Sequence, residues 1–307
     1  MKSELELQMF FTEHLTPLLE PMERYRIENV KDIKKKLLAV IPCICFLVIG
    51  SFSHIPFLIF LLCLPVLFFI GGAYQSFIKM SSHLKRQFKI KIMPELLKFL
   101  FADFEYIANQ RIAKSVIEKS MIFSKHIAIA EGEDFMRFKL GETTIMFCET
   151  TAYSNSEKII FQGIFISASF NKNFSSKTFV LPVTFSTYFQ SIKRRLLDNF
   201  QMVKLEDVEF DKEFIVFSTD QIGARYVLTT SLMNRLLDYK RKIKKKISFS
   251  FVDNRLYCAI PNYLNLFEPA LFEPFDFDLI KKSYNPLKIY TDIVEDLNLN
   301  LRIWTKQ

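Results

Sequence analysis

A long uncharged apolar stretch sets the strongest limit on how this chain can fold. It runs from Leu37 to Ile78 and contains no Lys, Arg, Asp or Glu. A helix needs roughly 20 apolar residues to cross the hydrocarbon core of a bilayer, so the length of the stretch predicts two crossings. The polar residues at 51–54 divide it into a first crossing, about 37–51, and a second, about 55–74.

Basic residues flank this stretch on both sides, and the turn between the two crossings carries no formal charge. The flanking residues are Lys31, Lys34, Lys35 and Lys36 before it, and Lys79, Lys85, Arg86, Lys89 and Lys91 after it. Because positive flanks remain on the cytoplasmic side, we expect a two-pass protein of the cell (inner) membrane with both termini in the cytoplasm.

Three other interpretations compete with a spanning hairpin. A re-entrant hairpin would suit the short first crossing. A buried pair of helices in a soluble protein is less consistent, because no polar face interrupts the apolar run. A secretory signal is disfavoured because the run starts late and is too long.

Helical segments are predicted on either side of the hairpin. Residues 1–36 form an amphipathic arm, which Pro17 and Pro21 should kink or divide into two short helices. Residues 79–126 form a basic helical stalk that includes a helix over 95–110. We expect the two arms to pack side by side. Their apolar stripes indicate ordinary core packing, with a dimer seam or a partner groove as the alternative.

From about Glu131 the apolar pattern changes to a period of two, which predicts a cytoplasmic α+β domain over 127–307 with a largely antiparallel sheet and a few helices. Expected strands cover 143–151, 159–170, 178–183, 214–218 and 297–304, and expected helices cover 186–200, 229–243 and 286–296. The helix over 229–243 could be capped by Thr230 or Ser231.

A two-residue turn, Asp253-Asn254, predicts a hairpin between residues 247–252 and 255–260. Its register pairs Phe251 with Leu256, Phe249 with Cys258 and Ile247 with Ile260. These pairs place apolar side chains together on one face of the hairpin.

Residue inventory argues against several kinds of site. The spacing of the five cysteines matches neither a disulfide-rich scaffold nor a zinc site, which indicates a reducing compartment. No histidine follows Glu131, so the sheet region cannot build a Ser/His/Asp or Cys/His site from its own residues. Glycine is scarce, and no phosphate-binding loop appears. We therefore expect no metal, no cofactor and no catalytic residue.

Two acidic clusters could support acid–base chemistry or bind a cation. They are Glu206, Asp207 and Glu209, and Glu131, Glu133 and Asp134. Neither has the spacing of an EF-hand, and we interpret both as solvated turns.

A polar pocket and a lipid contact are the two further candidates. The pocket would use Asp220 (as a helix cap), Arg225, Tyr226, Arg302 and Trp304, although these residues could equally form structural ion pairs and cation–π contacts. The lipid contact would use Lys240, Arg241, Lys242, Lys244, Lys245 and Lys246. This basic run could instead offset a helix macrodipole. Nucleic acid is a third ligand for the run, but aromatic interleaving is missing.

Several stretches together resemble the bacterial membrane-protein family catalogued as domain of unknown function 3137. They are FFTEHLTPLLEPMERYR, the two crossings, FQGIFISASFNKNFSSKTFVLP, VKLEDVEFDKEFIVFSTDQIGARYVLTTSLMNRLL and LNLNLRIWTK. The resemblance implies a cytoplasmic domain on a two-helix hairpin and no known activity. It also hints at a LemA-type membrane protein as partner, because the genes are often neighbours. Gly223 stands where the family pattern has an acidic residue.

The leading hypothesis is a non-enzymatic, membrane-anchored binding or scaffold domain. Its partner would be a membrane protein or anionic inner-leaflet lipid, and not nucleic acid. The second hypothesis is a membrane-associated enzyme that acts on a lipid or peptide through carboxylates and Arg225.

Overall fold

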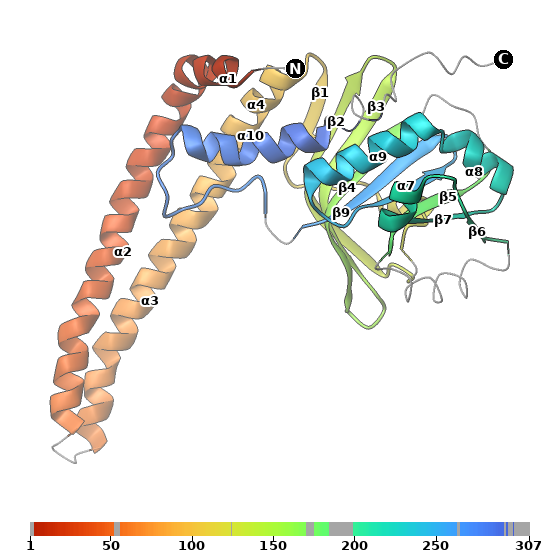
Figure 1. The fold of residues 1–307 in the computed structure, drawn as a ribbon. Helices are drawn as coiled ribbons and strands as arrows, with labels where there is room; N and C mark the ends of the chain where they lie inside the picture. Colours follow the sequence, from red (N-terminus) through yellow and green to blue (C-terminus); the bar gives the residue numbers. More distant parts are fainter. Residues whose placement is uncertain are drawn as a thin grey trace. The chain divides into compact units, whose positions relative to one another are not determined.

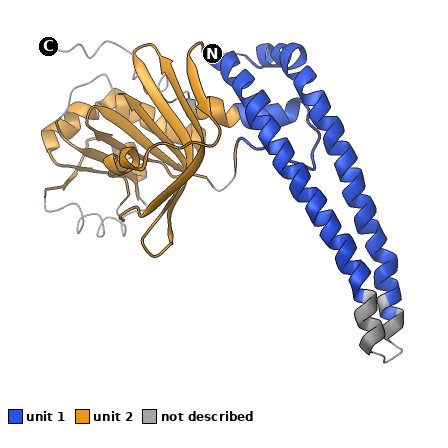
Figure 2. Ribbon diagram, turned by 180° about the vertical axis from the view of Figure 1, so that it is seen from behind, with its two compact units in different colours: residues 1–100, 267–284 blue, residues 101–266, 285–307 orange. Residues whose placement is uncertain are grey.

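The computed structural model describes residues 3–51, 56–123, 125–169, 175–183, 199–262, 265–291, 293 and 297, with only the backbone at 47, 49–51 and 56–62. The chain divides into two compact units (Figure 2). Unit 1 comprises Met1–Leu100 and Phe267–Tyr284, and unit 2 comprises Phe101–Leu266 and Asn285–Gln307.

Unit 1 is built on two long antiparallel helices (Figure 1). Its helices are α1 (Glu4–Phe10), the π-helical turn η1 (Phe11–Leu15), α2 (Thr16–Ser51), α3 (Pro56–Gln87), the π-helical turn η2 (Phe88–Ile92) and α4 (Met93–Leu100). The rings of Tyr25 and His83 lie 4.6 Å apart between α2 and α3. Apolar side chains from both helices, including Leu19 and Leu84, are fully or almost fully buried between them. The two helices are therefore held together by their own core.

Each π-helical turn ends just before a proline. The Thr16 N–H bonds the Phe11 carbonyl ahead of Pro17, and the Met93 N–H bonds the Phe88 carbonyl ahead of Pro94. Proline lacks the N–H and clashes with the carbonyl four residues earlier, and a wider turn changes the position of that carbonyl. The backbone therefore stays helical from α1 into α2. The expectation that the N-terminal arm could be two short helices is wrong.

A segment distant in sequence completes unit 1. The Glu23 carboxylate accepts hydrogen bonds from Arg26 at 2.6 and 2.7 Å and from the Phe275 N–H at 3.0 Å. The segment leads into α10 (Phe277–Thr291). The sequence analysis predicted that this helix starts at Pro286, but it begins earlier, at Phe277. Asp276 explains the difference, because its side chain caps the helix by accepting from the N–H groups of residues 278 and 279.

Unit 2 contains one nine-stranded antiparallel sheet in the described residues, with strand order β1-β2-β3-β4-β9-β8-β5-β7-β6. The strands are β1 (Phe104–Ile107), β2 (Ile129–Leu140), β3 (Thr143–Tyr153), β4 (Ile159–Ser169), β5 (Thr178–Pro182), β6 (Gln201–Val203), β7 (Phe214–Ser218), β8 (Ser248–Val252) and β9 (Arg255–Pro261). The mixed α+β class is therefore confirmed. The predicted helix over 95–110 is wrong, because α4 ends at Leu100 and β1 pairs with β2.

Both faces of the sheet are covered, which explains why so many strand residues are apolar. One face packs Cys148, Phe165 and Tyr257 against the region of α5 (Lys114–Lys119). The other face lies under α9 (Thr230–Ile243), where the rings of Tyr239 and Phe249 are 6.4 Å apart. The short helices α7 (Val208–Glu213) and α8 (Gln221–Val227) lie near the β6–β7 edge (Figure 1).

The hairpin of β8 and β9 confirms the predicted register. Phe249 pairs with Cys258 and Phe251 with Leu256, while Ile247 lies just before the paired strand. Asp253 and Asn254 both have positive φ, at 50° and 56°, as a type I′ turn requires. The cap of α9 is Thr229, not Thr230 or Ser231. The predicted helix over 186–200 and strand over 297–304 lie almost wholly outside the described residues.

Apolar side chains are exposed toward the C-terminal end of α2 and the N-terminal end of α3. Large exposed residues there are Leu37, Leu38, Ile41, Ile44, Phe46 and Val48 on α2, and Leu64, Leu67, Phe68, Ile70, Tyr74 and Ile78 on α3. In the described residues, one helical stretch, Cys63–Leu100, is long and apolar enough to cross a membrane, and 11% of its most apolar window is buried. This exposure does not fit a buried soluble helix pair.

Candidate functional site

A pocket of about 280 Å³, which we call the acidic pocket, opens at β2, β3 and β4 of unit 2. The residues that line it are Glu131, Gly132, Glu133, Glu149, Thr150, Thr151, Gln162, Gly163, Ile164, Asn262 and Asn265. Eight of these eleven residues have carboxylate, hydroxyl or amide side chains, which favours a polar ligand.

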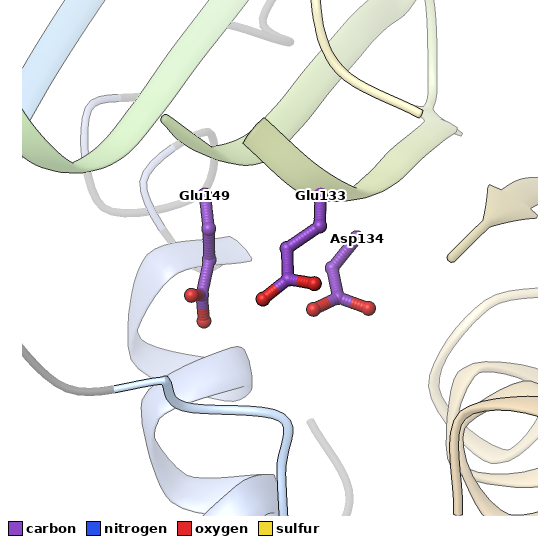
Figure 3. A group of neighbouring side chains, drawn as sticks. All are labelled: Glu133, Asp134 and Glu149. Atoms are coloured by element: carbon purple, nitrogen blue, oxygen red, sulfur yellow. The ribbon is translucent and has the colours of Figure 1, made fainter. Parts of the chain in front are cut away.

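Two carboxylates that line this pocket, Glu133 and Glu149, lie beside a third, that of Asp134 (Figure 3). In Glu133, Asp134 and Glu149, one oxygen of each side chain lies within 4.8 Å of the others. Glu133 and Glu149 stand directly opposite each other in the β2–β3 register. Like charges at such a cross-strand pair are unfavourable, so packing of the sheet alone does not explain this arrangement.

An irregularity in β2 brings the third carboxylate to the same side. The register shifts between Glu133 and Met136, and Asp134 has a positive φ of 56°. Neighbouring residues on a regular strand point to opposite faces, but the bulge turns Asp134 toward Glu133. The Asp134 side chain belongs to a residue with no exposed surface.

Hydrogen bonds hold two of the carboxylates in place. The Tyr106 hydroxyl donates to Asp134 Oδ1 at 2.6 Å, and the Leu266 N–H donates to Glu149 Oε1 at 2.8 Å. Burial and then the charge of Asp134 raise the pKa of Tyr106, so this hydroxyl remains a donor. Burial also raises the pKa of the neighbouring Cys148 thiol to about 11, which makes it a poor nucleophile.

Two of the seven glycines shape the pocket wall. A Cβ on Gly132 would lie 2.3 Å from the Glu149 carbonyl oxygen. A Cβ on Gly163 would lie 2.2 Å from the Ile260 carbonyl oxygen, and Gly163 has a φ of 154°. Strand backbones approach so closely here that no larger residue fits without movement.

Carboxylate and amide oxygens are the ligand set of hard cations such as Ca²⁺ and Mg²⁺. The same group could pair with an ammonium or guanidinium group, or one carboxyl could serve as an acid or base. Among the described residues, these three carboxylates form the one cluster with the spacing of a metal site.

The sequence predicted this cluster only in part. Glu131, Glu133 and Asp134 lie in strand β2, so the interpretation as a solvated turn is wrong. Glu149 was missed. Alternation along β3 places Glu149 on the same face of the strand as Ile145 and Phe147. A carboxylate on an otherwise apolar strand face is the sequence signal that could have identified it.

The second acidic cluster supports local structure. Asp207 caps α7 by accepting from the Phe210 N–H at 3.0 Å, and Glu209 pairs with Arg241 at 3.1 Å. Asp207 therefore stabilises a helix terminus, and Glu209 pairs with a cation of unit 2.

The structure describes three of the five residues predicted to form a polar pocket, and these three, Asp220, Arg225 and Tyr226, lie in or next to α8. Asp220 caps α8 by accepting from the N–H groups of Ile222 and Gly223. Arg225 donates to the carbonyls of residues 204 and 221, at 3.2 and 3.4 Å, and Tyr226 is 53% exposed. Arg302 and Trp304 lie outside the described residues. Arg225 is not among the described residues that line the acidic pocket.

Three residues of the basic run at the end of α9 are held by carboxylate or amide side chains. Lys240 pairs with Glu213, Arg241 with Glu209 and Asp238, and Lys245 donates to Asn262 Oδ1 at 2.5 Å. Burial lowers the pKa of both Lys240 and Lys245. Lys242, Lys244 and Lys246 are exposed, and Lys244 ends the helix in a left-handed conformation.

Comparison with known proteins gives one family and one remote structural likeness. Curated proteins show no match to the chain. The crystal structure of the mycobacterial trehalose monomycolate transport factor A, TtfA, is similar with a TM-score of 0.36 and 10% sequence identity, over 70% of this chain and 96% of that chain. Residues 159–299 match the family described as "Protein of unknown function (DUF3137)". The resemblance predicted from the sequence is thus confirmed, and this region, which includes β4 to β9, is assigned to the DUF3137 family.

Proposed function

We propose that the protein is a membrane-anchored binding or scaffold protein, in which α2 and α3 insert as a two-pass hairpin and unit 2 is on the cytoplasmic side. The observation that carries this proposal is the exposed apolar surface of the helix pair, where Phe68 is 75% and Leu67 66% exposed. Soluble proteins rarely expose contiguous apolar patches of more than a few hundred Å².

Transfer of this surface into a bilayer would stabilise the inserted state. Burial of one large apolar side chain contributes roughly 1.5–3 kcal/mol, and both helices present many such residues. Pro42 and Pro65 lie inside these helices, and helix-breaking residues are tolerated where neighbouring helices satisfy the backbone. The short first crossing is lengthened by lysine stems that reach back to the headgroups.

The five free cysteines provide a test of insertion in the unmodified chain. Cys43, Cys45 and Cys63 lie in α2 and α3, whereas Cys148 and Cys258 are buried in unit 2. With the full chain in sealed vesicles, a membrane-impermeant maleimide should label none of them from either side. All five should react after denaturation in detergent.

Rapid labelling of Cys45, which is exposed on the protein surface, would show that the helix pair lies in water and would refute the anchor. A Ser156→Cys variant is the matched control, because Ser156 is exposed in the turn after β3. Its thiol should react only when the reagent has access to the cytoplasmic side, which also reports the orientation.

The partner in this proposal is a membrane protein, with a LemA-type protein as the first candidate, or acidic inner-leaflet lipid. Support comes from the family resemblance and from the covered sheet, which gives unit 2 a rigid frame. Crosslinking in native membranes followed by purification of the full chain should recover a stable protein partner. Recovery of lipid alone would count against the protein–protein scaffold.

A second candidate function is an enzyme that acts on a lipid or peptide, and the acidic pocket is the observation that favours it. Glu149 would be the acid or base, while Arg225 would contribute only if substrate linked it to the pocket. Product formed from membrane lipids or peptides by the full chain should disappear in Glu149→Gln and persist in Glu142→Gln. Equal activity in both variants would exclude this pocket as the catalytic site.

A further inference from the structure

Four exposed lysines lie on α2 and α3 of unit 1 where the apolar surface of these helices begins. We call them the basic collar: Lys31, Lys34 and Lys35 on α2, and Lys79 on α3. The exposed apolar residues Leu37 and Leu38 follow the collar lysines on α2, and the exposed Ile78 directly precedes Lys79 on α3. The collar therefore occupies the boundary between polar and apolar surface on both helices.

Asp32, which lies next to Lys31 in the sequence, is already paired inside the helix pair. Lys36 Nζ donates to Asp32 Oδ2 at 2.6 Å and to Ser76 Oγ at 2.7 Å, and the Ser76 hydroxyl donates to Asp32 at 3.0 Å. The stem of Lys36 passes 3.8 Å from the Cβ position of Gly72, where a side chain is missing. Lys36 thus crosses from α2 to α3 and neutralises Asp32, which leaves the collar lysines as the outward charges.

Like charges are crowded within the collar. Lys31, Lys34 and Lys35 are related by three and four residues, so they share one face of α2, where like-charge pairs are unfavourable. Helix α3 has no Asp or Glu along its length. Between residues 27 and 79 the chain has five lysines against the two carboxylates Glu28 and Asp32. An anionic ligand from outside the protein would offset this excess of positive charge.

We propose that the basic collar binds the phosphate groups of acidic glycerophospholipids at the bilayer surface. The inference rests on the proposed membrane anchor, because insertion of the apolar ends places the collar at headgroup level. An ammonium group offers three donors and a compact charge. Each basic residue near an anionic surface strengthens lipid binding by up to about fivefold. This assigns acidic-lipid recognition to unit 1 and not to the Lys240–Lys246 run.

The test measures how many acidic and how many zwitterionic lipid molecules remain bound to the full chain. The protein is reconstituted in vesicles with equal amounts of phosphatidylglycerol and phosphatidylcholine of matched acyl chains, released gently and weighed by native mass spectrometry. The wild type should retain phosphatidylglycerol in preference. The variant K31Q/K34Q/K35Q should lose that preference by about tenfold or more, and K79Q should lose a smaller part.

A second triple variant, K242Q/K244Q/K246Q, removes the same number of charges from the exposed part of the α9 run and should keep the preference. An unchanged lipid ratio in the collar variant, or a lost ratio in the control variant, would overturn the inference. Thiol protection is measured in the same vesicles. If the thiols are protected while the ratio is unchanged, the collar is wrong and the anchor stands; if Cys45 reacts, the anchor itself fails.

Discussion

At the scale of single residues, the acidic pocket depends on positions where the ordinary rules of a sheet are broken. Glu133 opposes Glu149 across two strands, and Asp134 takes a left-handed conformation to join them. Each departure is unfavourable alone. Strained backbone of this kind often lies at functional sites, which makes the acidic pocket a candidate site.

Gly132→Ala tests how tightly this wall is built. The new methyl group would meet the Glu149 carbonyl oxygen at 2.3 Å, so strand β2 must shift. Overpacking of this kind destabilises by roughly 1–3 kcal/mol, measured as a lower thermal midpoint in detergent solution. Gly71→Ala is the control, since nothing lies within 4 Å of its Cβ position. Equal midpoints for the two variants would contradict the tight approach of β2 and β3.

Tyr290 should govern part of the alkaline stability of unit 2. Burial first, then the nearby Cys258 and Glu149, raises its pKa to about 12. An unfolded tyrosine ionises near pH 10, so the contribution is complete below that pH and declines as pH rises from about 10 to 12. Tyr290→Phe should flatten this decline in denaturant titrations, with the exposed Tyr226→Phe as control. A decline that is as steep in Tyr290→Phe as in the wild type would refute the assignment.

Residue-level prediction from sequence succeeded where a local rule decides the outcome. The Asp253-Asn254 turn and the Asp220 cap depend on neighbours within four residues, and both are confirmed. The acidic cluster depends on β2 and β3 pairing across a bulge. No local pattern indicates which residue a strand faces, so Glu149 was found only in the folded chain.

At the scale of elements, a few long-range contacts decide how helices are continued and joined. The sequence predicts a kink or a break at Pro17, but the π-helical turn before it keeps the backbone helical, and a second π-helical turn precedes Pro94. Helix α10 starts at a cap, Asp276, that lies ten residues before Pro286. The proline suggested the wrong start because residues of its type are favoured in the first helical turn.

Glu23 should fasten the Phe267–Tyr284 segment to α2. Its carboxylate accepts from Arg26 and from the Phe275 N–H, and the hydrogen bond from Arg26 is the main cause of its lowered pKa. This contribution is present above the ordinary pKa of 4.5 and is lost as pH falls through the lowered value. Hydrogen bonds to charged groups contribute roughly 1.5–3 kcal/mol, so Glu23→Gln should speed amide exchange in the segment by about tenfold or more at neutral pH.

The matched variant for this measurement is Glu20→Gln on the same helix, whose carboxylate is exposed. It should leave exchange in Phe267–Tyr284 at the wild-type rate. Similar acceleration in both variants would mean that charge on α2, and not the contact of Glu23, holds the segment.

At the scale of the whole molecule, the chain combines a helical unit with a large apolar outer surface and a sheet unit whose core is enclosed. Buried residues of unit 1 such as Leu15, Met22 and Leu84 lie outside the apolar stretch. The helix pair therefore has a core that does not depend on a bilayer. The α+β class and the antiparallel sheet were predictable from period and composition, whereas the division of α10 between the two units was not.

Excision of the hairpin should separate solubility from folding. Replacement of residues 37–78 by a short Gly/Ser linker joins two points that are close in space, since Lys36 and Ser76 are hydrogen-bonded at 2.7 Å. The shortened chain should be monodisperse without detergent in size-exclusion chromatography and should retain the sheet signal in circular dichroism. Continued dependence on detergent would show that another surface causes membrane association.

The distribution of charge along α2 and α3 also has an electrical consequence. Moving one elementary charge through a membrane potential of about 100 mV takes roughly 2.3 kcal/mol. Residues 37–78 carry no formal charge, so their passage into the bilayer requires no electrical work, whereas the lysines on both flanks would have to move against the field of a cell that is negative inside. In the proposed two-pass topology, a membrane potential would therefore not hinder the entry of the hairpin, but it would oppose any later movement of the flanking lysines across the membrane.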